Sequence, residues 1–169
     1  MYDMTRVMSK GYNDATTLEQ RTKTLEQLGE QRWKDAEAGT FAYGPEYNKA
    51  PKDDDPQFVK EYYDYYRTER GYHERSVNSG NSWTATTPLS FMNMPILTFI
   101  KEISPRPLLI IAGEKAHSRY FSETAFQNAN EPKELLIVPN AVHIDFYDQI
   151  DVIPFDKMDT FFRTNLNKR

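Results

Sequence analysis

Two short apolar runs in the last third of the chain constrain its fold more than any other feature. Residues 107–113 read PLLIIAG, and residues 134–138 read ELLIV. Apolar runs of this length that do not alternate with polar residues are typical of strands buried on both faces of a parallel sheet. Between them, Ser122 is predicted to cap a helix over residues 122–130. Two parallel strands joined through a helix form a βαβ unit, so the sequence predicts an α/β fold here.

The first 103 residues are predicted to form a helical region of their own. Thr17 begins T-L-E-Q, a capping-box pattern completed by Gln20, and apolar residues at helical spacing follow as far as Gly39. Asp55 and Pro56 are interpreted as the N-cap and first residue of a second, tyrosine-rich helix. The sequence therefore predicts two parts, a helical region over residues 1–103 and a βαβα region over residues 104–169.

Composition excludes several classes of function. The 169 residues carry a net charge of −4 and no cysteine, and only three histidines are present. A basic surface for nucleic acid and a dedicated transition-metal site are therefore not expected. No apolar run approaches the ~18 residues of a membrane span, and no signal peptide is recognisable. We expect a cytoplasmic protein with no cofactor, no metal, no nucleic-acid partner and no membrane partner.

His143 is the main candidate for chemistry. It follows the second apolar run by five residues, in the loop PNAVHIDFYD. An imidazole can accept and return a proton near neutral pH, provided that a hydroxyl lies within hydrogen-bond reach. An ordinary loop histidine is the alternative interpretation. His117 lies on the neighbouring loop, where it could line the same pocket or be a polar loop residue, and His73 is expected to be exposed.

The segments SPRPLLIIAGEKAHSRYFSE, ELLIVPNAVHIDFYD and IPFDKMDTFF together resemble the C-terminal part of the α/β-hydrolase superfamily, in particular its bacterial dienelactone-hydrolase-like branch. The resemblance implies that residues 107–113 and 134–138 are the last two strands and that a final helix from Pro154 packs on the sheet. It implies that His143 is the catalytic histidine. Residues ~12–100 would be the cap-like helical insertion that walls the substrate pocket.

The sequence departs from that pattern at the nucleophile. The superfamily carries its serine on a G-x-S-x-G elbow between a strand and a helix. No such motif occurs in this chain, and Ser79-Gly80 follows no predicted strand. The resemblance implies that the early strands, the oxyanion loop and the serine would precede residue 1. We therefore expect this chain to correspond to roughly the C-terminal half of a hydrolase.

The triad acid is left open among several residues. A common pattern in this superfamily puts Asp three residues after the glycine that ends the penultimate strand, and that position holds Ala116. Glu114, at the strand end, and Glu123, near the start of the next helix, are the acidic alternatives. A carboxylate in a helix's first turn is also stabilised by the helix dipole alone. Asp145 follows His143 by two residues, and a local turn or cap accounts for it.

Three functions remain open on the sequence. The chain could belong to a serine hydrolase of esters, lactones or amides, with His143 as general base, a small-molecule substrate and the serine on another polypeptide. It could instead be an inactive fragment that oligomerises, or a module whose tyrosine-rich helices bind a ligand or partner. A penultimate strand without its inner neighbour would leave a bare sheet edge. We therefore expect self-association or pairing through that edge.

Overall fold

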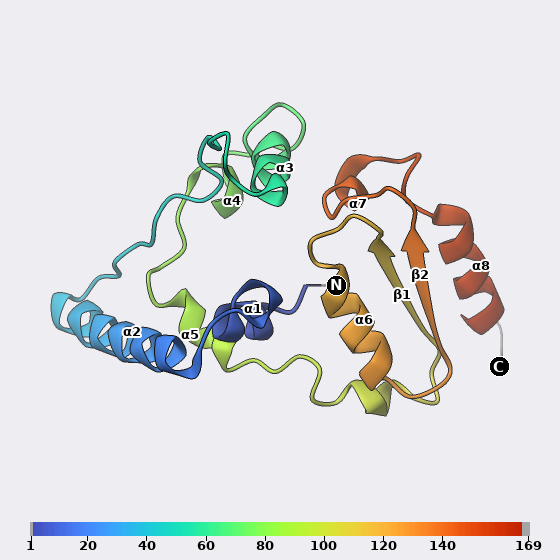
Figure 1. Cartoon of the computed structure of the whole chain (residues 1–169), viewed down its shortest axis with the longest axis horizontal. Helices are drawn as coiled ribbons and strands as arrows, with labels where there is room; N and C mark the ends of the chain where they lie inside the picture. The colour runs from blue at the N-terminus through green and yellow to red at the C-terminus, as the bar shows by residue number, and fades with distance from the viewer. Residues whose placement is uncertain (1, 167–169) are drawn as a thin grey trace. The chain divides into compact units, whose positions relative to one another are not determined.

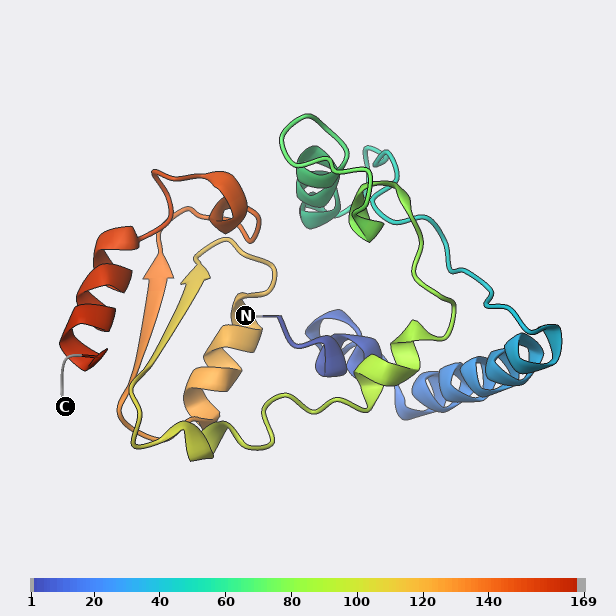
Figure 2. The ribbon, with the colours of Figure 1, turned by 180° about the vertical axis from the view of Figure 1, so that it is seen from behind.

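The computed structural model describes residues 2–166 (Figures 1 and 2). None of the described helices combines the length and apolarity that crossing a membrane requires. The elements in chain order are α1 (Met4–Lys10), a 3-10 turn (Tyr12–Asp14), α2 (Leu18–Ala38), α3 (Gln57–Tyr66), α4 (Val77–Gly80), α5 (Thr87–Met92), a 3-10 turn (Ile100–Ile103), β1 (Leu108–Gly113), α6 (Arg119–Asn128), β2 (Lys133–Val138), α7 (Asp145–Asp148) and α8 (Phe155–Leu166).

The chain divides into two compact units. One comprises residues 3–95, and the other comprises Tyr2 and residues 96–166. The first unit is built from α1 to α5, and the second contains both strands, α6 to α8 and the loop of His143. The candidate site therefore belongs to the second unit.

The long helix of the first unit starts and ends as its sequence predicts. The Thr17 side chain accepts a hydrogen bond from the Gln20 N–H at 3.2 Å, and the Gln20 side chain accepts one from the Thr17 N–H at 2.8 Å. At the other end, Gly39 adopts the left-handed conformation with φ of 66°, which glycine reaches at little cost. The predicted capping box and the glycine stop are confirmed.

The predicted start of the second helix is wrong by one residue. α3 begins at Gln57 with Pro56 at the N-cap position, and no side chain caps it. Asp55 accepts a hydrogen bond from the Lys52 N–H at 2.7 Å instead, which closes the preceding turn. The aspartate satisfies the nearer backbone donor because that turn brings Lys52 back to it.

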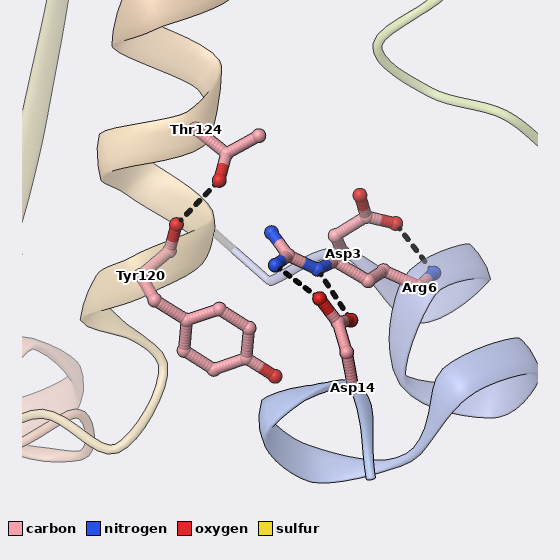
Figure 3. A network of polar contacts seen from close by, with 5 residues as sticks. All are labelled: Asp3, Arg6, Asp14, Tyr120 and Thr124. Atoms are coloured by element: carbon pink, nitrogen blue, oxygen red, sulfur yellow. Dashed lines mark hydrogen bonds and ion pairs between the residues drawn. The ribbon is translucent and has the colours of Figure 1, made fainter. Parts of the chain in front are cut away.

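The start of the first unit is held by charged side chains (Figure 3). Arg6 makes two hydrogen bonds to Asp14, at 2.8 and 2.7 Å, and the hydrogen bond from Arg6 lowers the pKa of the Asp14 carboxyl. Asp3 caps α1 by accepting from the Arg6 N–H at 2.9 Å. In the second unit, within α6, the Thr124 hydroxyl donates to the Tyr120 carbonyl at 2.8 Å.

The second unit contains the predicted parallel strand pair. β1 and β2 run parallel in register from Leu108 opposite Lys133 to Gly113 opposite Val138. Figure 1 shows α6 alongside β1, α8 alongside β2, and α7 beyond the ends toward which both strands point. A Lys157–Glu134 ion pair at 2.5 Å links α8 to β2. The predicted βαβ order is therefore confirmed.

The helix between the strands starts earlier than its predicted cap. α6 begins at Arg119, after Ser118, so Ser122 lies inside the helix and is 1% exposed. Phe121 and Ala125 on the same helix are buried together with Ile110 of β1. The prediction of Ser122 as the cap is wrong because the buried face of α6 begins one turn earlier.

In the part of the chain that the structure describes, the sheet has two strands, so the outer edge of β1 pairs with no other strand. A groove of about 350 Å³ lies in this unit and is lined only by apolar residues, among them Ile96, Phe99, Leu108 and Ile110. Phe99 is 69% exposed within the described chain. The apolar groove is therefore lined in part by β1, the strand whose outer edge is unpaired within the described chain.

Replacing Phe121 by alanine is expected to destabilise the second unit. The side chain is fully buried, and deleting a buried phenylalanine costs about 3–5 kcal/mol. Phe162 of α8 is 51% exposed and provides the matched control, since F162A removes the same phenyl ring from a half-exposed position. Urea unfolding followed by circular dichroism should show a large loss for F121A and a small one for F162A. Equal losses would contradict this placement of the core.

Candidate functional site

The loops that follow the two strands are joined by backbone hydrogen bonds. The Glu114 N–H donates to the Val138 carbonyl at 2.9 Å, and the Lys115 N–H donates to the Ala141 carbonyl at 3.0 Å. The Asn140 N–H in turn donates to the Glu114 carboxylate at 2.9 Å. The loop over residues 139–144, which carries His143, is therefore fixed to the loop over residues 114–118.

Gly113 makes this close contact possible. A β-carbon at Gly113 would come within 2.3 Å of the Ala141 carbonyl oxygen, a distance at which the loop would have to move. Ala141 and Ile144, on either side of His143, are each 2% exposed. The glycine that ends the first apolar run thus allows the histidine loop to pack directly against the end of β1.

Both ring nitrogens of His143 have a hydroxyl within hydrogen-bond distance. Nδ1 lies 2.6 Å from Ser118 Oγ, and Nε2 lies 3.0 Å from the Tyr147 hydroxyl. Ser118 comes from the residue before α6 and is 3% exposed, whereas Tyr147 lies on α7 and is 42% exposed. His143 is thus held from the buried side by a serine and from the open side by a tyrosine.

A second histidine lies against the first. The ring centres of His117 and His143 are 5.4 Å apart, and the Tyr2 ring stands edge-on to both, at 5.9 and 5.6 Å. Burial lowers the pKa of His117 to about 4. Burial, together with the nearby His117, lowers the pKa of His143 to about 4 as well. Both rings are therefore neutral at pH 7, and His143 can accept a proton.

A cavity of about 300 Å³ opens at this histidine. Its polar groups come from Ser118, Ser122, His143 and Tyr147. Its apolar lining consists of Ile111, Ala112, Gly113, Ala116, Phe146, Ile153, Pro154 and Met158. A mostly apolar cavity with a few convergent polar groups is the usual form of a small-molecule site.

The three acidic candidates make other contacts. The Glu114 carboxylate accepts from the Asn140 N–H, and Glu123 forms an ion pair with Arg119 at 2.8 Å. Asp145 accepts from the Val142 N–H at 2.8 Å, as expected of a local turn. Glu114 therefore lies at the histidine loop, where its carboxylate accepts a hydrogen bond from a backbone N–H. Within residues 2–166, no three His, Asp or Glu side chains gather as metal ligands.

Sequence reasoning missed the roles of Ser118 and Tyr147. Tyr147 follows His143 by four residues, a spacing that places two side chains on one face of a helical turn. Ser118 had no comparable signal, because its contact with His143 joins two loops that are 25 residues apart. The exposed His73 and the fully buried Ser79 lie in the first unit, where the Ser79 hydroxyl accepts from the His73 N–H at 3.1 Å.

No protein-family model matches the chain. Among curated proteins, the chain is 71% identical over 166 residues to the uncharacterised protein PA2218 of Pseudomonas aeruginosa, covering 98% of this chain and 44% of that protein. The uncharacterised protein YfhR of Escherichia coli is 36% identical over 72 residues, which are 41% of this chain and 25% of YfhR. The chain therefore spans less than half the length of these relatives.

Solved structures define the class of fold. The crystal structure of PA2218 matches with a TM-score of 0.94 and 71% identity over 98% of this chain and 51% of that one. The α/β hydrolase GrgF from Penicillium sp. sh18 matches at TM-score 0.61 and 21% identity, covering 88% of this chain and 50% of GrgF. DcsB, solved in complex with its substrate analogue, matches at TM-score 0.64 and 16% identity, covering 88% of this chain and 52% of DcsB. The chain has part of an α/β-hydrolase fold: a helical first half, then two parallel strands and a C-terminal helix.

The two buried histidines should make folding stability depend on pH. In the unfolded chain each ring takes up a proton near pH 6.5, whereas in the folded chain each stays neutral down to about pH 4. The unfolded chain therefore binds more protons in this window, so stability falls as the pH falls from 7 to 4. After allowance for solvent screening, we expect a loss of about 2 kcal/mol.

Urea unfolding at a series of pH values measures this loss. The H117N/H143N double variant has no titrating ring at these positions and should show a flatter profile between pH 7 and 4.5. An unchanged slope in the double variant would mean that other groups cause the acid sensitivity.

Proposed function

We propose that this chain supplies the histidine base of a serine hydrolase that cleaves esters, lactones or amides. The observation that carries the proposal is His143, neutral at pH 7, with a hydroxyl at each ring nitrogen and a cavity beside it. A neutral imidazole that already has a hydroxyl group within hydrogen-bond distance of its ring nitrogens is suited to general-base catalysis. The α/β-hydrolase fold supports the same reaction class by analogy.

The proposed reaction uses a serine from outside these 169 residues. His143 takes the proton of that serine hydroxyl while its oxygen bonds to the carbonyl carbon, and the tetrahedral intermediate collapses as the proton passes to the leaving group. Water, deprotonated by the same ring, then releases the acid product and regenerates the serine. The absence of G-x-S-x-G from the sequence and the 44% coverage of PA2218 support a nucleophile elsewhere.

The cavity favours a small substrate with an apolar part. Ile111, Phe146 and Met158 would contact that part, while His143 and Tyr147 stand at the polar end. A small ester or lactone fits this arrangement, and lactones are the substrates that the dienelactone-hydrolase-like resemblance implies. The lack of cysteine is compatible with the cytoplasm as the place of action.

We propose that the free edge of β1 pairs with a strand from the remainder of a hydrolase core. The apolar groove in the same unit supports this proposal, because Ile96, Phe99 and Leu108 would lose contact with water in such a complex. A second copy of this chain is the alternative occupant. In that case the chain would be a non-catalytic, oligomerising or ligand-binding fragment.

Co-expression with the unmatched part of PA2218 tests the proposal. The 71% identity makes that part the natural partner for this chain. We expect the tagged chain to co-purify with it and the complex to hydrolyse p-nitrophenyl esters. H143A should lower the rate by about 100-fold or more, the usual contribution of a general base. H73A changes an exposed histidine of the other unit and should leave the rate unchanged.

Two results would contradict the proposal separately. A complex that hydrolyses the ester equally well with H143A would remove His143 from the reaction. A chain that forms homodimers by light scattering and never co-purifies with the PA2218 part would favour the non-catalytic alternative.

A further inference from the structure

Ser118 occupies a helix-capping position without capping the helix. It directly precedes α6, where a serine hydroxyl usually accepts a backbone N–H from the first turn. No such bond is present, and Ser118 Oγ lies instead 2.6 Å from His143 Nδ1. The serine gives up a common stabilising contact of its own helix, so its hydroxyl is committed to the histidine.

The chemistry of the two hydroxyls decides the direction of each hydrogen bond. A neutral imidazole has one N–H donor and one acceptor nitrogen. The phenol of Tyr147, 3.0 Å from Nε2, is more acidic than an aliphatic hydroxyl and is the better donor, which favours its donation to Nε2. This arrangement favours a proton on Nδ1, with the Nδ1–H donating a hydrogen bond to Ser118 Oγ at 2.6 Å. The hydroxyl proton of Ser118 remains able to point into the cavity that Ser118 lines.

We propose that Ser118 is the positioning residue of His143 and holds the ring as the Nδ1–H tautomer, in the place where a hydrolase triad has a carboxylate. The role of Nε2 as the base rests on the proposed function, but the tautomer does not. Tyr147 donates to Nε2 from the open side and so marks where the hydroxyl of an attacking serine would bind.

The two acidic candidates for the triad acid have partners other than His143. Glu114 accepts from the Asn140 N–H, Glu123 pairs with Arg119, and Ala116 stands where the superfamily pattern has Asp. A neutral serine orients the ring but does not stabilise its protonated form as a carboxylate would. This agrees with a lowered pKa for His143, whose first cause is burial.

The test is long-range ¹H–¹⁵N NMR of the histidine rings in the whole chain at pH 7, which distinguishes protonated from unprotonated ring nitrogens. We expect the Nδ1–H tautomer of His143 in the natural sequence. S118A should reduce it to a mixture in which the Nε2–H form is substantial, and S118T, which keeps the hydroxyl, should restore it. Assignment of His143 comes from the signal missing in H143N.

Y147F provides a second variant that does not threaten folding, because Tyr147 is 42% exposed. It should shift the ring toward a mixture of the two tautomers, since Nε2 loses its hydroxyl donor while the Ser118 hydroxyl can either donate or accept. An Nε2–H tautomer of His143 in the unmutated chain would overturn the proposal. Nδ1 would then be the acceptor and Ser118 the donor, which is the arrangement of a nucleophilic serine and its general base. An unchanged tautomer in folded S118A would overturn it as well. Neither result depends on whether the hydrolase activity exists.

Discussion

The close contact between Gly113 and Ala141 is the constraint on which the site depends. Because Gly113 lacks a side chain, the carbonyl of Ala141 can lie directly against the end of β1. The hydrogen bond from Lys115 to that carbonyl and the one from Asn140 to Glu114 then fix the two loops together. His143 and Ser118 come from these two loops, so their 2.6 Å contact follows from the contact of the loops.

Burial and hydrogen bonding act on His143 in complementary ways. Burial keeps the ring neutral by making the charged form costly. The two hydroxyls determine which nitrogen carries the proton, and the packed rings of Tyr2 and His117 limit how the imidazole can turn. A ring that is neutral, oriented and open to a cavity on one side is what proton transfer from a hydroxyl requires.

The elements were largely predictable from sequence because each has a local cause. The apolar runs at residues 107–113 and 134–138 gave the parallel strand pair, and Thr17 with Gln20 gave the start of α2. The two errors have different causes. Tertiary packing buries Ser122 inside α6, although it resembles a cap. At Asp55 two local structures compete, and the carboxylate accepts from the Lys52 N–H of the preceding turn rather than capping α3.

The candidate site was predictable only in part, since its contacts join distant segments. His143 could be singled out by its place after a strand, and Tyr147 by its helical spacing from His143. The contact of Ser118 with His143 could not be found this way, because nothing local to Ser118 distinguishes it from an ordinary helix cap. Glu114 could be chosen as a candidate acid from its position at the strand end, whereas the hydrogen bond that its carboxylate accepts from the Asn140 N–H joins two loops and could not be predicted locally.

We propose that this chain carries the base of a hydrolase and that the serine lies outside these 169 residues. Site-mapped labelling with a fluorophosphonate, applied to this chain together with the unmatched part of PA2218, tests it most directly. We expect one adduct, on a serine of the PA2218 part, and its loss in H143A. An adduct on Ser118 or on any other serine of these 169 residues, or labelling that survives H143A, would contradict this proposal.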